Sequence, residues 1–391
     1  MLFTLAIKNI MGSKLRSFLN IFVTSVSFFT IIFVSGMYDG MKHYAKQITI
    51  ETEVGGGAYW HPEYDPYDSM TFENSSSKIP ENINKLIEKK IATPILVGNG
   101  TIYPEGRMMP IIIKGIDPNQ TIIRLPSNEF KNYKNIDFPV IIGKEMASKT
   151  KLKVGDTFII RWLDQDKTYD ANEAKIIHIM DTKNIKIDLN HVWLPLNLAQ
   201  ELFGLHNKAT YVIHEKKQPI LSDKGLWIHR DVDYLIQDIE AAIKADEPGN
   251  QILFFILLLL SGIGIFNAQV LSIFKRSKEI GTLLAIGMSR STVIFLFTLE
   301  GSLIALFASI MTIIVFGPAL LWFSKFGISM PIDYSEMGLI ISKRLIPVYS
   351  LDLIVNTAIL IIIIVVLVSY LPARKISKMN IIDALKGKPV I

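Results

Sequence analysis

The sequence predicts a membrane protein: four transmembrane α-helices, with a large α+β extracytoplasmic domain of two lobes between the first and second helix. Hydrophobic residues make up 50% of the 391 residues. Charged residues make up 20%, against about 25% in soluble domains. The apolar residues gather in four stretches long enough to cross a bilayer, which takes about 20 residues. This clustering excludes a disordered chain and a purely soluble enzyme.

Each element can be placed in order along the chain. Residues 1–17 are predicted to form an amphipathic helix, and residues 18–37 form the first span, which has no charged side chain. The later spans are predicted at 251–274, 292–323 and 351–371. A secretory signal peptide is the alternative for the first span, but its apolar run exceeds the ~7–15 residues of a signal. We therefore interpret it as a retained anchor.

The distribution of lysine and arginine predicts the orientation. The N-terminal flank, the loop 275–291 and the tail 372–391 together carry 12 basic residues and two acidic ones. The loop 324–350 is nearly balanced in charge. Both termini and the loop 275–291 are therefore expected in the cytoplasm, with the chain crossing the membrane four times. Residues 38–250 are expected in the periplasm.

The periplasmic segment reads as a mixed α+β domain. Between Tyr38 and Gly249 there are 26 basic and 30 acidic residues, so the pI of 9.0 comes from the membrane flanks. This balance excludes a nucleic-acid-binding face. We expect a small β-rich lobe, about 115–175, inserted into a βαβ-type lobe formed by both flanks. Short apolar runs between turn residues predict strands at 95–97, 109–113, 140–142, 158–162, 176–180, 192–194 and 211–213.

Motifs for catalysis or metal binding are missing from the sequence. It has no cysteine, no G-x-x-x-x-G-K-[ST] and no H-E-x-x-H, so we expect no catalytic residues and no metal. The densest cluster of possible ligands is the segment from His61 to Asp68, with three carboxylates and an imidazole. A hard-cation site is the alternative there, but we favour a kinked segment whose aromatic residues cover the edge of a lobe.

A polar side chain inside a membrane span costs free energy unless it is paired, so each one indicates a structural or functional role. Asn267 in the second span and Glu300 in the third are the two clear examples. A proton or ion relay would need a longer series of such groups. We expect these two to form hydrogen bonds that fix the packing of the second and third spans.

The cytoplasmic loop 275–291 carries the most informative motif. The run Arg276-x-x-Glu279-Ile280-Gly281-x-Leu283-x-Ala285-Ile286-Gly287 resembles the signature of MacB/FtsX-type ABC transporter permeases. Pro372-Ala373-Arg374 near the C-terminus is similar to the family's P-A-R-x-A tail, although Ile376 replaces its small residue. The alternative from residue physics alone is an interfacial helix that lies in the headgroups.

The resemblance implies a function and its partners. This loop would be the coupling helix that docks on a separate ABC ATPase subunit, through Arg276, Glu279, Ile280, Gly281, Leu283, Ala285, Ile286 and Gly287. ATP and magnesium would be used by that ATPase, and this chain would bind no cofactor directly. A second permease subunit, the same chain or a sister, would complete the complex among the membrane lipids.

Length and layout are most similar to the lipoprotein-releasing permeases of the LolC/LolE type. Such a protein would extract lipoproteins from the outer leaflet of the inner membrane and pass them to a periplasmic carrier. Apolar residues at the outer ends of the first two spans would contact the acyl chains: Phe33, Met37, Met41, Phe254, Phe255 and Leu258. The alternatives are a MacB-like efflux permease for peptides or antibiotics, an FtsX-like regulator of a cell-wall hydrolase, and a receptor or scaffold without an ATPase.

Overall fold

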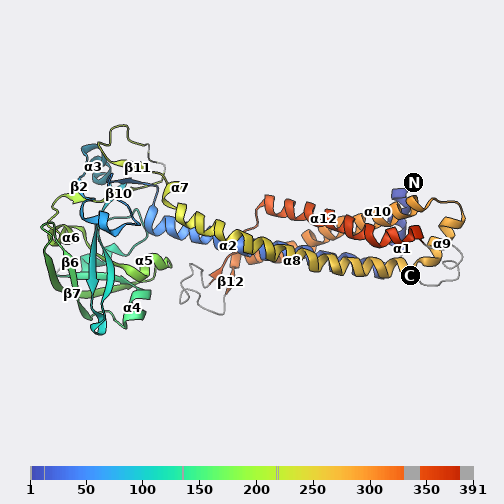
Figure 1. Cartoon of the computed structure of the whole chain (residues 1–391), viewed down its shortest axis with the longest axis horizontal. Helices are drawn as coiled ribbons and strands as arrows, with labels where there is room; N and C mark the ends of the chain where they lie inside the picture. Colours follow the sequence, from blue (N-terminus) through green and yellow to red (C-terminus); the bar gives the residue numbers. More distant parts are fainter. Residues whose placement is uncertain are drawn as a thin grey trace. The chain divides into compact units, whose positions relative to one another are not determined.

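The computed structural model describes residues 2–12, 14–133, 136–216, 218, 220–329 and 344–378 (Figure 1). Most of the predicted loop 324–350 and of the tail 372–391 lies outside these residues. The chain forms two compact units. The helical unit comprises the chain up to Lys42, Lys244–Ser329 and the chain from Arg344, and the α+β unit comprises His43–Ile243.

The helical unit contains four helical stretches long and apolar enough to cross a membrane: Ser17–Val54, Gln237–Lys275, Arg290–Phe326 and Leu351–Arg374. This confirms the predicted fold class of four apolar helices with a large α+β domain between the first and second. The unit is built from α1 (Leu2–Gly12), α2 (Lys14–Thr49), α8 (Gln237–Lys275), α9 (Ser277–Ala285), α10 (Arg290–Met311), α11 (Gly317–Phe326) and α12 (Leu351–Arg374).

Helices α2 and α8 run through the boundaries that the sequence suggested. The expected borders at 37/38 and 250/251 both fall inside continuous helices, because no residue near Met37 stops a helix and α8 accommodates Pro248. The third stretch does break near Gly317-Pro318, where a π-helical turn (η5, Thr312–Phe316) joins α10 to α11. Proline is tolerated there because the first turn of a helix needs no N–H partner.

The four long helices share one apolar core. Residues from all of them meet in it: Phe28, Ile31, Leu258, Ile265, Ala305, Ala308, Ile361 and Val365. Helices α10 and α12 approach closely at Gly301, where an added Cβ would lie 2.2 Å from Ser369 Oγ. Only glycine permits this approach, as is usual between packed membrane helices.

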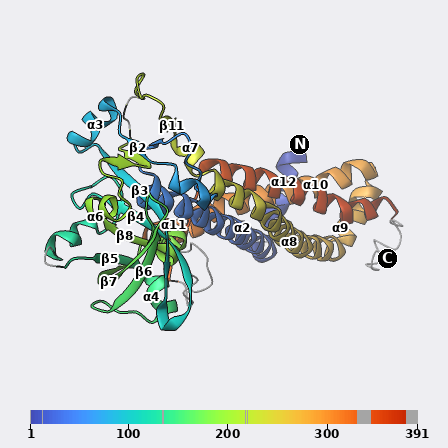
Figure 2. The same ribbon diagram turned by 60° about the vertical axis from the view of Figure 1, so that its left-hand side comes forward.

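The α+β unit is organised around one nine-stranded mixed sheet in the order β11-β1-β10-β3-β4-β8-β5-β7-β6. Its strands are β1 (Ala58–Trp60), β3 (Ala92–Ile102), β4 (Met109–Ile116), β5 (Pro139–Gly143), β6 (Thr157–Leu163), β7 (Tyr169–Met180), β8 (His191–Pro195), β10 (Tyr211–His214) and β11 (Ile228–Arg230). Figure 2 shows β3, β4, β8 and β5 side by side. All seven predicted strands are present, and the short strands β1 and β11 were missed.

The prediction of a separate inserted lobe over residues 115–175 is wrong, because this range does not form a sheet of its own. Strands β5, β6 and β7 belong to this range or extend from it, but β5 pairs with β8 and β6 pairs with β3. These backbone hydrogen bonds join the range to the strands on either side of it. Short helices connect the strands: α3 (Glu81–Glu88), α4 (Lys144–Thr150), α5 (Ile185–Asn190), α6 (Leu196–Leu202) and α7 (Val232–Leu235).

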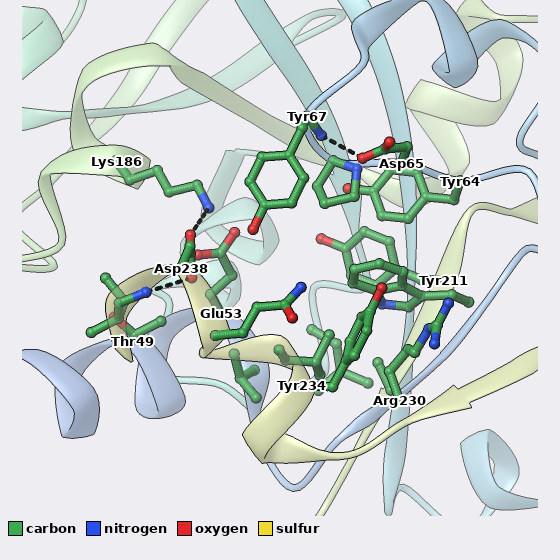
Figure 3. Close-up of a pocket in the computed structure, with 18 of the residues that line it drawn as sticks. Thr49, Glu53, Tyr64, Asp65, Tyr67, Lys186, Tyr211, Arg230, Tyr234 and Asp238 are labelled. Carbon is green, nitrogen blue, oxygen red and sulfur yellow. Dashed lines mark hydrogen bonds and ion pairs between the residues drawn. The ribbon is translucent and has the colours of Figure 1, made fainter. Parts of the chain in front are cut away.

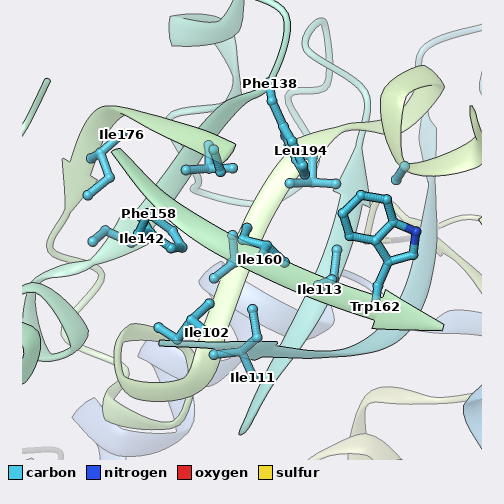
Figure 4. Packing of buried hydrophobic residues seen from close by; sticks show 14 of the residues in the cluster. Ile102, Ile111, Ile113, Phe138, Ile142, Phe158, Ile160, Trp162, Ile176 and Leu194 are labelled. Carbon is cyan, nitrogen blue, oxygen red and sulfur yellow. The ribbon is translucent and has the colours of Figure 1, made fainter. Parts of the chain in front are cut away.

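Both faces of the sheet are buried. Leu96 lies in one hydrophobic cluster, whereas its neighbours Ile95 and Val97 lie in another, as the alternation of side chains along a strand requires. Figure 4 shows the first cluster, with Ile113, Ile160 and Trp162 packed together. Burial on both faces explains why these strands read as continuous apolar runs.

A buried polar network ties the end of α2 to α5. Asp188 accepts hydrogen bonds from Thr182 N at 3.0 Å and Thr182 Oγ1 at 2.7 Å. Asn184 Nδ2 donates to Thr52 Oγ1, in the π-helical turn η1 (Ile50–Val54) that follows α2. Burial raises the pKa of Asp188 to about 6, more than the Thr182 hydrogen bonds lower it.

This pKa predicts a pH dependence of stability. A carboxyl whose folded pKa lies above its ordinary value of 3.8 favours folding when protonated, so its contribution is lost as the pH rises towards 6. The loss is about 3 kcal/mol, since one pKa unit is worth about 1.4 kcal/mol. We expect Asp188→Asn to flatten the change in Tm between pH 4 and pH 6.5. Asp137→Asn, at an exposed position, is the matched control and should leave the profile unchanged.

Candidate functional site

Helix α9 is a short helix whose two ends are fixed by the sequence. It begins after Arg276 and ends at Ala285, with Ile286 as its C-cap. Gly287 follows with a φ of +101°, a conformation that favours glycine. Gly287 N donates to Leu284 O at 3.1 Å, and Met288 N donates to Leu283 O at 3.1 Å. This pattern is the Schellman motif, which ends a helix sharply.

One face of α9 is packed against the ends of the spanning helices. Ile280 and Leu284 are buried in a cluster completed by Ile273, Val293, Phe297, Ala373 and Ile376. These residues come from α8, α10, α12 and the turn after α12. The apolar stripe seen in the sequence therefore faces protein. Leu283 is partly buried against this cluster and also against a second one formed by α1 and α10.

A buried ionic network holds the start of α9. Arg276 is 9% exposed, and its Nη1 lies 2.6 Å from Glu300 Oε2 while its Nε lies 2.6 Å from Glu279 Oε2. Asn9 Nδ2 of α1 donates to the other oxygen of Glu300 at 2.5 Å. The guanidinium also lies 4.8 Å from the ring centre of Phe297. Helices α1, α9 and α10 are thereby joined through one carboxylate, and Figure 1 shows α1 and α9 at the same end of the helical unit.

The structure divides the predicted coupling residues into two groups. Arg276, Ile280 and Gly281 are buried and anchor the helix. The exposed group, which we call the α9 face, consists of Glu279, Ala285, Ile286 and Gly287, together with Lys278 and Thr282. Ile286 is 79% exposed, although it is a large apolar side chain. The tip of α9 therefore leaves one large apolar side chain uncovered by the described part of the chain.

The two polar residues predicted inside the spans have different roles. Glu300 does bind neighbouring helices, through Arg276 and Asn9. The expectation for Asn267 is wrong, because its side chain is exposed on α8. Gln269, two residues along, is 5% exposed and takes the inward position, as the helical period requires. Two further polar contacts between helices were not predicted from the sequence: Asn9 with Glu300, and the hydrogen bond between Ser25 and Thr312, 2.9 Å long.

The predicted substrate-binding residues do not come together within this chain. Phe33 packs on Phe29 and on Phe323 of α11, with ring centres 5.6 and 5.2 Å apart. Leu258 is buried in the core of the four helices, and Phe254 packs against that core. Phe255 is 63% exposed instead, and it lines a groove of about 300 Å³ between α8 and α12. Met37 and Met41 are half-buried on α2.

The segment from His61 to Asp68 lines a cavity in the α+β unit. Within the described part of the chain, no group of three or more His, Cys, Asp or Glu could hold a metal ion. Asp65 and Asp68 instead accept hydrogen bonds from the backbone N–H of Tyr67 and Met70, which shape the local turns. The ring of Tyr64 packs on Phe72 and Tyr211, in agreement with aromatic residues that cover an edge of the domain.

Comparison with known proteins addresses the helical unit first. Residues 251–381 match the model of the family described as FtsX-like permease C-terminal. The macrolide export ATP-binding/permease protein MacB of Chromobacterium violaceum is 29% identical over 209 residues, which cover 50% of this chain and 30% of that protein. The MacB of Haemophilus ducreyi is 20% identical over 98% of this chain and 55% of its own length.

Residues 251–381 thus form an FtsX-like permease domain, and the chain is similar to MacB-type ABC transporter permeases. An uncharacterized ABC transporter permease of Methanocaldococcus jannaschii is 23% identical over 65% of this permease and 63% of its own length. Among solved structures, the extracellular domain of the noncanonic ABC-type transporter YknZ from Gram-positive bacteria is 19% identical, with a TM-score of 0.27, over 41% of this chain and 83% of that one. The permease spans about a third of the length of the first MacB relatives that it matches.

Proposed function

We propose that this permease is the transmembrane subunit of an ABC complex in which a separate ATPase subunit docks on the α9 face. The observation that carries the proposal is the combination of an exposed tip and an anchored base. Ile286 stands out into solvent, whereas Arg276 and Ile280 fix α9 to α10 and α12. A force applied at Ile286 is therefore passed to the spanning helices instead of bending a loop.

The orientation follows from the same proposal. The α9 face carries Lys278, and the neighbouring Lys275 is also exposed. With the other basic flanks, these charges favour the cytoplasmic side for α1 and α9. The ATPase would then bind from the cytoplasm, and the α+β unit would lie on the opposite side of a bacterial inner membrane.

We propose that the complex extracts lipoproteins from the outer leaflet of the membrane and transfers them to a periplasmic carrier. Removing an acyl chain from a bilayer costs about 0.8 kcal/mol per CH₂ group, so a multiply acylated protein needs an energy source. Phe33 packs on Phe323 of α11, whereas Phe255 lines the groove between α8 and α12. Shielding of acyl chains by both residues would therefore need a second permease subunit, either the same chain or a sister.

A second candidate is export of a small or peptidic compound. The name of the MacB relatives, macrolide export, favours it. The two candidates differ in what accumulates when the protein is depleted from its own host. Lipoprotein release predicts lipoproteins retained in the inner-membrane fraction with unchanged drug tolerance. Export predicts normal lipoprotein sorting with increased sensitivity to the exported compound.

Docking of the ATPase can be tested with a photo-crosslinking amino acid at position 286 of the full chain in cells. We expect it to capture a protein identified by mass spectrometry as an ABC ATPase with a Walker motif. The same amino acid at position 15, where Leu15 of α2 is 74% exposed, is the matched control and should not capture it. If position 286 yields only lipid or solvent products while the protein is folded in the membrane, the docking proposal is wrong.

A further inference from the structure

The α+β unit contains a cavity of about 480 Å³, within the range of about 300–1,000 Å³ typical of small-molecule sites. We call it the tyrosine cavity because Tyr64, Tyr67, Tyr211 and Tyr234 all line it (Figure 3). Its wall also includes η1, α5 and the first turn of α8. The turn that follows α2 and the first turn of α8 thus both border this cavity.

Tyr211 presents its hydroxyl group to this cavity. Tyr211 is only 5% exposed, and Figure 3 shows its hydroxyl directed into the cavity. Within the described part of the chain, no hydrogen bond to this hydroxyl is found. Burial, followed by the charge of Glu53, raises the pKa of Tyr211 well above its usual value, so the hydroxyl stays neutral. The hydroxyl oxygen is therefore available as a hydrogen-bond partner for a bound ligand.

Charges around the cavity favour a positively charged ligand. Its lining carries four carboxylates and two cations, namely Glu53, Glu63, Asp65, Asp238, Lys186 and Arg230. Lys186 Nζ lies 3.2 Å from Asp238 Oδ2, and Arg230 stacks 4.1 Å from the centre of Tyr234, although Arg230 Nε has no hydrogen-bond partner among the described residues. Behind the wall, the buried Lys114 forms an ion pair with Glu53 at 3.6 Å, so three cations face four carboxylates and one negative charge remains in excess.

We propose that the tyrosine cavity binds an ammonium or guanidinium group carried on a short apolar or aromatic stem. The charged group donates hydrogen bonds to Glu53 and to the hydroxyl oxygen of Tyr211. The faces of the tyrosine rings attract the same cation through their quadrupoles. This site goes beyond the transport function proposed above, and it does not depend on the ATPase.

The test is a calorimetric titration of the full chain in detergent with tryptamine, an aromatic primary amine. Indole-3-propionate, which has the same ring system and a negative charge, is the matched probe and should bind at least about tenfold more weakly, a difference of about 1.4 kcal/mol. A capped Ala-Lys-Ala peptide separates the two sources of the cation. Tighter binding of the peptide assigns the site to a lysine side chain, and tighter binding of tryptamine assigns it to a free amine.

Substitutions of cavity residues test whether tryptamine binds in the tyrosine cavity. We expect Tyr211→Phe and Glu53→Gln each to weaken tryptamine binding about tenfold, since each removes a hydrogen bond, one of them to a charge. Tyr169→Phe on β7 and the half-buried Glu145→Gln on α4 are matched controls outside the cavity and should bind as the unmodified protein does. If Glu53→Gln does not fold, Glu63→Gln at the exposed rim tests the charge instead. Equal binding of both indole probes, loss of binding in the controls, or no binding at millimolar tryptamine would each overturn the proposal.

Discussion

Replacing Arg276 by methionine should destabilise the helical unit by about 3–5 kcal/mol, the usual cost of removing one partner of a buried ion pair. Glu300, whose side chain is 8% exposed, would keep only Asn9 as its partner. The expected result is a large fall in the Tm of the purified chain, followed by tryptophan fluorescence. Lys275→Met is the matched control, because it removes the same charge one residue earlier from an exposed side chain.

The double variant Arg276→Met/Glu300→Gln separates stability from coupling. It leaves no charge buried, so most of the lost Tm should return. Coupling should not return, because the ionic link from α9 to α10 and α1 is then lost and only the apolar packing of Ile280 and Leu284 remains. The measurement is ATP hydrolysed per molecule transported by the reconstituted complex with its ATPase. Normal coupling in this double variant would show that the Arg276–Glu300 pair serves folding alone.

Replacing Gly287 by alanine should uncouple ATP hydrolysis from transport while leaving the complex assembled. A residue with a side chain loses roughly 1–2 kcal/mol in a left-handed conformation, so the turn after Ile286 would shift to relieve this strain. The α9 face would then present Ile286 at a different angle to the ATPase. We expect transport to fall about tenfold or more, since 1.4 kcal/mol corresponds to a factor of ten, with ATP hydrolysis nearly unchanged.

Gly155→Ala is the matched control for this prediction. Gly155 has a φ of +97°, against +101° at Gly287, and an added Cβ would meet nothing within 4 Å at either position. The two variants therefore carry similar backbone strain, one in the α+β unit and one beside α9. If both reduce coupling to the same degree, the effect is one of general stability and the α9 face is not the docking site. Glu279→Gln, which removes a charge from that face, is expected to behave like Gly287→Ala.

Much of the helical unit could be predicted because its signals are local. A span needs about 20 consecutive apolar residues, which can be read directly from the chain. The α9 motif also lies within a dozen neighbouring residues, from Arg276 to Gly287. Its end was readable from Gly287, since helices commonly finish with a left-handed glycine.

The parts that escaped prediction depend on partners far apart in sequence. Asn9 and Glu300 are 291 residues apart, so neither position alone indicates the hydrogen bond between them. The inward position on α8 belongs to Gln269 and not to Asn267, because the helical period, and not polarity alone, sets the direction of a side chain. The nine-stranded sheet was divided into two lobes because the pairing of β3 with β6 leaves no local trace.

The difference between α2 and α8 has a mechanical consequence. Over its 36 residues α2 contains no proline, and at 1.5 Å per residue it is a rod about 54 Å long. A tilt of about 5° at one end of such a rod displaces the other end by about 5 Å, roughly one turn of helix. Helix α8 carries Pro248, where a backbone hydrogen bond is lost and bending is easy. Helix α2 is therefore stiff, whereas α8 can bend at Pro248. Equal forces at one end of each helix would displace their other ends by different amounts.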